Sequence, residues 1–267
     1  MIRFLACKVF ILVSAISTGA LVYAEEPLKE EKIQFEGVKY RVVRMPAGRL
    51  ELAWKGKDGK PMRSFDQVQK HYAAKKRKVT FMTNAGIFEP GGVPSGLYVQ
   101  GHELLRPLNL RPGKGNFFLK PNGVFAIQST KGGARPAVIE SSSYKSYVER
   151  ALKAKDLYPF RIAIQSGPLL LSQGKIHPAF NRESKSRLHR NGVGVDQQRR
   201  VVFAITEFHA GSEGEVNLHG FARLFLHLGC QNALFLDGDL SQMVVNPKEK
   251  VNSNLFGAMF VVTEPQE

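Results

Sequence analysis

The sequence predicts an α+β fold, with a mixed β-sheet and flanking helices in a single domain. Short apolar runs divided by glycine and proline outnumber the stretches with helical periodicity. Helices and strands also do not alternate strictly along the chain, as they would in a parallel α/β protein. The 267 residues are 43% hydrophobic and 10% aromatic. This composition suffices for a core without disulfides and excludes wholesale disorder.

The first 24 residues form a separate segment. Arg3 and Lys8 precede an apolar run at residues 9–22, and small residues ending at Ala24 lead to an acidic exit. This pattern is typical of a secretory signal peptide, and the run is short for a membrane-spanning helix. We expect cleavage after Ala24, export to the periplasm or beyond, and membrane contact only through this segment. An uncleaved membrane anchor is the alternative.

The polar, charge-mixed residues 25–35 are predicted to be a leader or linker, and residues 36–267 the domain. Apolar alternation then predicts the first two strands, at 38–45 and 49–54. The proline and glycine between them favour a β-hairpin, so we expect these two strands to pair with each other.

A helix and a buried strand follow. Ser64 is a helix N-cap, and Gln67 stands three residues later as in a capping box. The apolar residues of this segment fall on one side of the expected helix. The short apolar run at 79–82 predicts a buried strand, which ends just before Asn84.

The middle of the chain is rich in short strands, with a second helix among them. That helix begins at Ser141 or Ser142 and runs through Leu152. A hairpin turn is expected between the second and third of the four strands. We predict these strands at 97–99, 117–120, 124–127 and 161–165.

The C-terminal third contains the clearest helix. Apolar residues from Leu218 to Leu228 follow the spacing of one buried face, Asn217 is the N-cap, and Gly229 ends the helix. Strands are predicted on both sides of it, the first two as a hairpin. They lie at 192–196, 201–206, 233–236 and 255–262.

The chain carries a formal charge of +15, and loss of Arg3 and Lys8 with the signal segment leaves +13. Such a charge favours anionic partners. For an exported protein, anionic envelope polymers, phospholipid surfaces or phosphate-bearing substrates are better candidates than nucleic acid. Cys7 leaves with the signal segment, so Cys230 has no partner for an internal disulfide and is predicted to be buried in the core.

Four short loop-forming motifs stand next to predicted strands. Each puts small residues beside a group that can bind or ionise, and polar groups on loops over a rigid sheet are the usual components of a site. We therefore predict a single cleft built from strand ends. The motifs are Asn84-Ala85-Gly86-Ile87-Phe88, Gln165-Ser166-Gly167-Pro168, Arg190-Asn191-Gly192-Val193-Gly194 and Leu236-Asp237-Gly238-Asp239.

The acidic motif has the strongest chemical character. Asp237 and Asp239 follow an apolar strand with Gly238 between them, and at strand spacing they point to the same side. Two such carboxylates can share a proton, divide into an acid and a base, or bind a divalent cation. An ordinary Asp-Gly turn is the alternative.

Two motifs supply neutral groups. The Asn84 amide, beside Gly86, suits a sugar hydroxyl or a phosphate oxygen, with a tight turn as the alternative. Ser166 and Gly167 let the backbone approach a ligand closely. Ser166 lacks the flanking glycine of a nucleophile elbow, so it is not predicted to be a hydrolase nucleophile.

Arg187 and Arg190 supply positive charge just before a glycine-rich strand. An arginine fork matches phosphate with two hydrogen bonds. A solvated basic loop is the alternative. No pair of histidines has metal-binding spacing, so no metal or other cofactor is predicted. A divalent cation at Asp237 and Asp239 is the alternative to that prediction.

In this order, over residues 80–262, the four motifs resemble the phosphodiester glycosidase family, and most of all its exported bacterial branch. The resemblance implies an α+β fold and a glycosidase activity. Two departures separate this chain from another branch of the family. That branch tends to read Asn-Gly-Gly-Phe-Phe at the first motif and Leu-Asp-Gly-Gly at the last, where this chain has Asp239 and its added charge.

The resemblance further implies hydrolysis of the C1–O bond of a sugar 1-phosphodiester. Asp237 would be the nucleophile or the base for water, Arg190 would neutralise the phosphate with Arg187 as second choice, and Asn84 with the Ser166 backbone would orient the substrate. Two rivals remain: a non-catalytic binder of anionic envelope glycans, and a metal-dependent phosphodiesterase.

Overall fold

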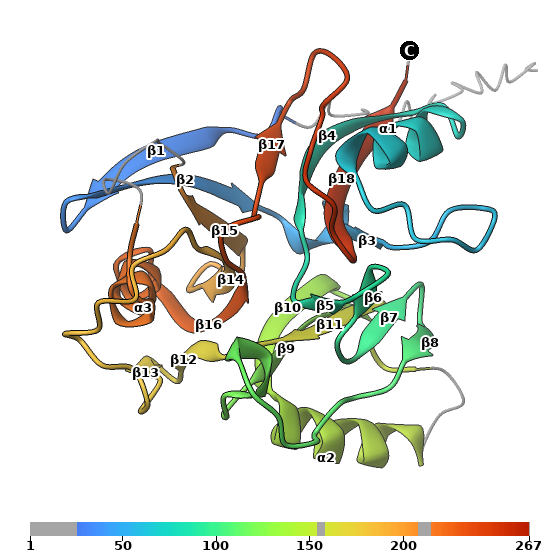
Figure 1. Cartoon of the computed structure of the whole chain (residues 1–267). Helices are drawn as coiled ribbons and strands as arrows, with labels where there is room; N and C mark the ends of the chain where they lie inside the picture. The colour runs from blue at the N-terminus through green and yellow to red at the C-terminus, as the bar shows by residue number, and fades with distance from the viewer. Residues whose placement is uncertain (1–25, 154–157, 208–214, 267) are drawn as a thin grey trace, which may run out of the picture.

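The computed structural model describes residues 26–153, 158–207 and 215–266 (Figure 1). The predicted signal peptide lies outside the described residues. In the described part of the chain, no helix has both the length and the apolar character needed to cross a membrane.

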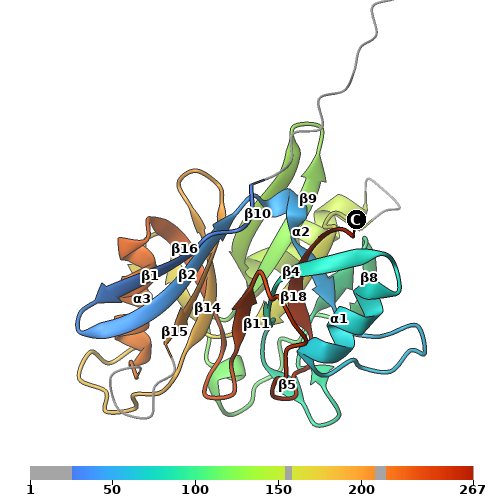
Figure 2. The same ribbon diagram turned by 90° about the horizontal axis from the view of Figure 1, so that it is seen from above.

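The largest sheet has seven strands and lies beside α3 (Figures 1 and 2). Its central strands are almost wholly buried, as expected of apolar runs covered on both faces. In spatial order the strands are β1 (Glu30–Phe35), β2 (Val38–Met45), β15 (Val201–Thr206), β14 (Asn191–Asp196), β16 (Cys230–Asp237), β12 (Leu169–Ser172) and β13 (Lys175–Ile176).

Two further sheets complete most of the molecule, and a small two-stranded sheet pairs β5 (Phe88–Glu89) with β6 (Val93–Pro94). The five-stranded sheet has the order β10 (Gly133–Glu140), β9 (Gly123–Thr130), β11 (Ile162–Ser166), β7 (Tyr98–Gln100) and β8 (Glu103–Arg106). The four-stranded sheet has the order β17 (Met243–Val245), β4 (Arg77–Asn84), β18 (Met259–Pro265) and β3 (Glu51–Ala53).

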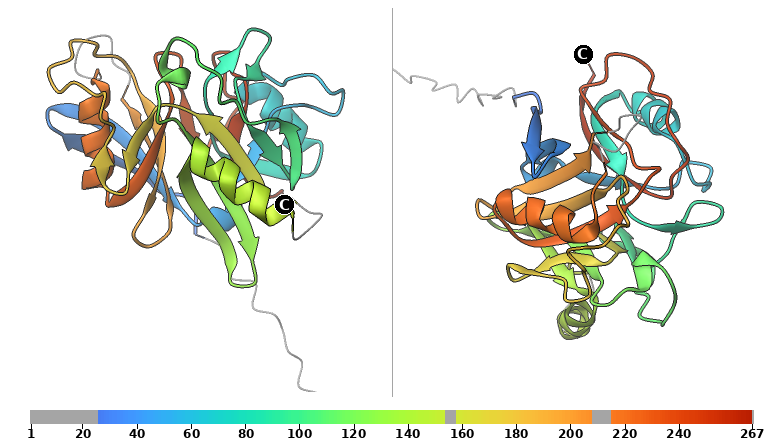
Figure 3. Two further views of the ribbon diagram at one scale, coloured as in Figure 1. Left: turned by 90° about the horizontal axis from the view of Figure 1, so that it is seen from below. Right: turned by 60° about the vertical axis from the view of Figure 1, so that its left-hand side comes forward.

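Each α-helix of the described residues covers a different sheet (Figures 1 and 3). The apolar face of α1 (Phe65–Ala73) packs on β4 and β18, and that of α2 (Ser141–Leu152) packs on β9 and β11. The α3 helix (Leu218–His227) packs Phe221 and Phe225 on the seven-stranded sheet. A central core joins side chains from all three large sheets, including Val43, Phe81, Phe125 and Leu234.

The predicted α+β class with flanking helices is therefore confirmed. All three predicted helices are present, and Asn217 caps α3 by accepting the Gly220 N–H. Within the described residues every strand pair is antiparallel, and the strands form several sheets where a mixed sheet was predicted. Hairpins join β1 to β2, β9 to β10 and β14 to β15, and the pairs between segments remote in the chain are antiparallel as well.

Three local predictions were wrong. The predicted hairpin of 38–45 and 49–54 does not form, because the 3-10 turn η1 (Ala47–Arg49) directs the chain from β2 into β3 of a different sheet. The stretch predicted as a strand at 117–120 contains the 3-10 turn η2 (Asn116–Phe118), so β9 pairs with β10 instead. Residues 30–35 of the predicted leader form β1, whose backbone pairs with β2.

The contact between α3 and the seven-stranded sheet depends on a glycine. A Cβ atom on Gly194 would lie 2.7 Å from Cys230 Sγ and 2.8 Å from Phe225 Cδ1. Cys230 is fully buried, and this burial raises the pKa of its thiol to about 12. The prediction of a buried, structural Cys230 is confirmed.

Candidate functional site

Three strand ends that are remote in sequence meet at one place. Asn191, the first residue of β14, is paired across the sheet with Asp237, the last residue of β16. Asn84 ends β4. The Asn191 amide donates to Asn84 Oδ1 at 3.0 Å and to Thr83 Oγ1 at 3.0 Å, and thereby joins the two sheets. The motifs that contain these residues therefore lie together.

Asn84 is the centre of this cluster. Its side chain is fully buried, and its Oδ1 also accepts the Gln242 backbone N–H at 3.1 Å. Its Nδ2 donates to Ser241 Oγ at 3.1 Å and to the Asp237 carboxylate. Because its amide is bonded on both sides, its orientation is fixed, and so is the direction in which it presents its N–H groups to Asp237.

Asp237 is the group in this cluster with the chemistry of a proton-transfer residue. The pKa of its carboxyl is raised from the ordinary 3.8 to about 6, mainly by burial and to a smaller extent by the nearby charge of Asp239. Hydrogen bonds from the Gly238 N–H, at 2.9 Å, and from Asn84 oppose that rise. A carboxyl that titrates near neutral pH can both accept and donate a proton.

Ser166 and Gly86 pack against each other next to Leu236, the residue before Asp237. The Ser166 hydroxyl donates to the Leu236 carbonyl at 3.1 Å and accepts the Ile87 N–H at 3.4 Å. Gly86 has a φ of +126°, and a Cβ there would lie 3.3 Å from Ser166 Cβ. Gly167 is packed more tightly, since a Cβ there would lie 2.6 Å from Asn122 Cβ. These residues fasten the loop after β4 to β16.

Arg190 lies on the other face of the sheet. Its guanidinium is buried and donates to the carbonyls of Val216, at 3.1 Å, and Ser186, at 3.2 Å. It also lies 5.5 Å from the centre of the Phe235 ring. Neighbouring residues of a strand point to opposite faces, and Asn191 takes the face toward Asn84. These contacts hold the Arg190 guanidinium away from Asn84, and the charge of Asp239 acts on it from the acidic motif. That Arg190 and Asp237 flank one hollow stays a prediction.

The remaining predicted residues lie around the edges of the cluster. Asp239 is exposed, and its Oδ1 accepts the His189 backbone N–H at 3.2 Å. Gly238 contributes the backbone N–H that binds Asp237. Arg187 lies with α3 in a separate pocket and donates to the Glu215 carbonyl at 3.0 Å. Among the predicted site residues, the structure thus groups Asn84, Asp237, Gly238, Gly86 and Ser166.

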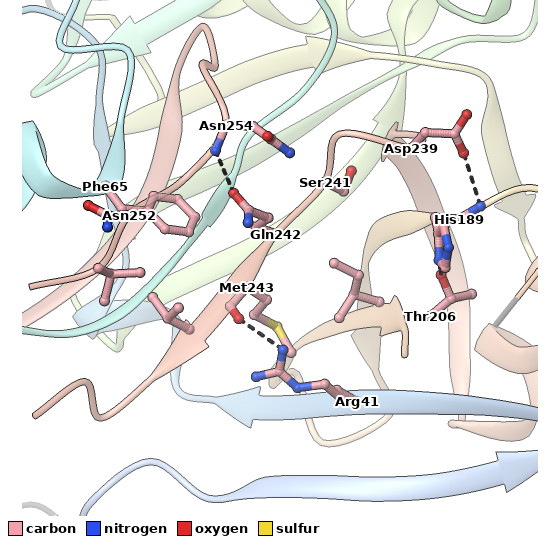
Figure 4. Close-up of a pocket in the computed structure, with 13 residues that line it drawn as sticks. Arg41, Phe65, His189, Thr206, Asp239, Ser241, Gln242, Met243, Asn252 and Asn254 are labelled. Carbon is pink, nitrogen blue, oxygen red and sulfur yellow. Dashed lines mark hydrogen bonds between the residues drawn. The ribbon is translucent and has the colours of Figure 1, made fainter. Parts of the chain in front are cut away.

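A pocket of about 440 Å³, whose lining residues are drawn in Figure 4, adjoins the cluster at Ser241. Ser241 links the two, because it lines the pocket and accepts the Asn84 amide. Asp239 lines the same pocket, and Arg41 donates to the Met243 carbonyl at 3.0 Å on its wall. The polar side chains of this lining suit the hydroxyl groups of a carbohydrate, whereas the Phe65 ring is fully buried. The lining includes Phe65, His189, Gln242, Asn252 and Asn254.

The donor groups that a metal would need are sparse. Within residues 26–153, 158–207 and 215–266, no group of three or more histidine, cysteine, aspartate or glutamate side chains lies close enough to hold an ion. A cation at Asp237 and Asp239 would therefore depend on these two carboxylates and on backbone oxygens or water.

The fold and this cluster define a class of protein. The sequence model of the phosphodiester glycosidase family matches residues 77–262, and the chain belongs to this family. The resemblance carried by the four motifs is thereby confirmed. A curated relative, the uncharacterized protein YigE of Escherichia coli K12, is 31% identical over 167 residues. That match covers 62% of this chain and 58% of the length of YigE.

Solved structures show the same fold. The zebrafish N-acetylglucosamine-1-phosphodiester alpha-N-acetylglucosaminidase catalytic domain, auto-inhibited by its pro-peptide, matches with a TM-score of 0.60 and 16% identity over 91% of this chain and 85% of that one. A hypothetical protein from Synechocystis matches with a TM-score of 0.54 and 14% identity, over 88% of this chain and 61% of that one. An exported-protein candidate from Burkholderia pseudomallei matches with a TM-score of 0.51 and 12% identity, over 84% of this chain and 74% of that one.

Proposed function

We propose that the protein hydrolyses the glycosidic C1–O bond of a sugar 1-phosphodiester in the cell envelope. The main support is the Asp237 carboxyl. It lies where three strand ends meet, and its pKa is raised to about 6. Family membership supports the reaction class, and the zebrafish protein is named for a substrate of this kind. The signal-like N-terminus and the exported-protein candidate from Burkholderia support the location.

The chemistry follows from the leaving group. A phosphate monoester leaves readily once the C1–O bond weakens, so the reaction needs activation of the attacking group more than protonation of the departing oxygen. Asp237 in its charged form attacks C1 directly or removes a proton from the attacking water. The water oxygen ends on C1 and the bridging oxygen leaves with the phosphate. Asn84 holds the Asp237 carboxylate in place, and the pocket beside Ser241 holds the substrate.

The test is hydrolysis of the methyl diester of N-acetylglucosamine 1-phosphate by the purified protein. We expect turnover that increases as the pH rises through about 6, because the charged form of Asp237 is the active one. Asp237→Asn should lower kcat by about 10²- to 10⁴-fold. Asp58→Asn is the matched control, since Asp58 lies in an exposed turn. Equal turnover in Asp237→Asn and wild type would remove Asp237 from the mechanism.

Labelled water separates this function from a metal-dependent phosphodiesterase that uses Asp237 and Asp239. In ¹⁸O water, C–O cleavage puts the label in the sugar, whereas P–O cleavage puts it in the phosphate. A chelator should leave the first reaction unchanged and abolish the second.

The high positive charge of the chain favours a second candidate, a non-catalytic binder of anionic envelope glycans. Such a binder would retain the diester at low salt, lose it steeply as salt rises, and release no product.

A further inference from the structure

A basic pocket of about 180 Å³ lies between β2 and the start of α3, away from the Asp237 cluster. A water molecule takes about 30 Å³ of liquid volume, so the space admits an anion of several heavy atoms. The charged and polar groups of its lining are Glu36, Tyr40, Arg182, Arg187, Asn217, His219 and Arg223.

Positive charge dominates this pocket. Arg182 and Arg187 are exposed, and Arg187 uses its Nη2 on the Glu215 carbonyl, which leaves its other N–H groups for further partners. The carboxylate of Glu36 already pairs with Arg223 Nη2 at 2.7 Å. Three guanidinium groups therefore face one carboxylate, so the pocket favours an anion.

The pocket is held in shape by Asn217. This residue is 7% exposed, and its Nδ2 donates to the carbonyls of Arg182 and Ser184, each at 3.0 Å. Its Oδ1 accepts the Gly220 N–H at 2.8 Å and so caps α3. One buried side chain thus fixes the arginine-bearing segment against the helix. Because the backbone is held in this way, only the arginine side chains lose conformational entropy when an anion binds.

The chain path separates this pocket from the Asp237 cluster. Leu188 forms a β-bridge with Val216, next to the Arg187 that lines the basic pocket. His189, one residue further on, lines the pocket beside Asp239 instead. Arg187, which the sequence suggested as a substrate-binding residue, therefore lines a different pocket.

We propose that this pocket binds a phosphate group through Arg182 and Arg187. Planar guanidinium groups match the oxygens of phosphate with paired hydrogen bonds. The phosphate belongs either to the free ion or to a phosphodiester in an anionic polymer. Phosphate binding at this pocket does not require hydrolysis at Asp237. A polymer bound through one of its phosphates here would place another part of its chain in the pocket beside Ser241.

The experiment titrates the ¹⁵N-labelled protein with inorganic phosphate and, separately, with dimethyl phosphate, at 20 mM and 200 mM salt. We expect saturable shifts of the His219 and Gly220 amide signals that weaken as salt rises. The double variant Arg182→Ala/Arg187→Ala should weaken binding at least tenfold. Tighter binding of inorganic phosphate would identify a free-ion site, and tighter binding of the diester would identify a polymer site.

Two further variants separate specific phosphate binding from a general effect of net charge. Arg150→Ala/Lys153→Ala removes the same charge from the exposed end of α2 and should leave binding within twofold of wild type. Glu36→Gln removes the competing carboxylate and should tighten binding severalfold. Equal losses in both double variants would reduce the effect to net charge. Absence of saturable shifts in the wild type would overturn the proposal.

Discussion

The raised pKa of Asp237 links the site to the stability of the fold. Between pH 3.8 and about 6 the folded protein binds more protons at Asp237 than the unfolded chain does. The free energy of unfolding therefore falls as the pH rises through this window, by about 1–3 kcal/mol for a shift of this size. Asp237→Asn removes this cost.

We expect Asp237→Asn to be more stable than wild type by about 1–3 kcal/mol at pH 8 and no more stable at pH 3.5. Urea denaturation at the two pH values measures the difference, with Asp58→Asn as the control that should show none. An equal gain at both pH values would mean that the Asp237 charge does not cause it.

Arg190 gives a second prediction at the scale of the residue. Arg190→Ala removes the guanidinium donor of the Ser186 carbonyl and the packing on Phe235, whereas the Val216 carbonyl keeps the Leu188 N–H at 3.3 Å. The free energy of unfolding should fall by about 1.5–3 kcal/mol, the contribution of a hydrogen bond to a charged group.

If the fold survives, Arg190→Ala should leave the KM for the diester within a few fold of wild type. A large rise in KM without loss of stability would restore Arg190 to the phosphate. Arg187→Ala is the comparison, because Arg187 is exposed and should change stability little.

The residues of the site divide into those that sequence reasoning could find and those that it could not. Asn84 and Asp237 were found because each follows an apolar run that predicts a buried strand. Asn191 stood inside a motif but had no assigned role, because its partner Asn84 is 107 residues away and only strand register brings them together. The sequence could not place the Arg190 side chain for the same reason, since it does not show which face of β14 each residue occupies, and the role of Arg190 stays a prediction.

At the scale of the element, the glycines of β14 decide how closely α3 can pack. Gly194→Ala puts a methyl group within 3 Å of Cys230 and Phe225, and neither can move without disturbing the helix or the sheet. We expect a loss of about 1–3 kcal/mol from overpacking. Thermal unfolding measures it, and Gly132→Ala is the control, because the nearest atom to a Cβ there is 3.9 Å away. A neutral Gly194→Ala would show that α3 can shift freely on the sheet.

Elements with strong periodicity were predicted well, and strand partners were not. The α3 helix and the β14–β15 hairpin agree with prediction because their signals are local. The pairing of β2 with β15, and of β3 with β18, depends on contacts between segments far apart in the chain. The alternating pattern of β2 and β3 fixes only that each is a strand.

At the scale of the molecule, the shared core predicts one cooperative unfolding transition. The core joins all three large sheets, and the single tryptophan, Trp54, lies where two of them meet. Its Nε1 donates to the Gly92 carbonyl at 2.8 Å and its ring lies 5.3 Å from Tyr98. Urea curves from tryptophan fluorescence and from far-ultraviolet circular dichroism should therefore coincide. Separate midpoints would show that one sheet unfolds by itself.

The buried thiol of Cys230 makes the protein its own reporter of internal motion. An alkylating reagent reacts with the thiolate form of cysteine. While α3 is packed on the sheet, the reagent cannot reach Cys230, and the raised pKa keeps its thiol protonated. Alkylation of Cys230 therefore requires α3 to separate from the seven-stranded sheet, and the alkylation rate measures how often this local opening occurs. A chain cut after Ala24 holds no second cysteine, and every adduct would record that one event.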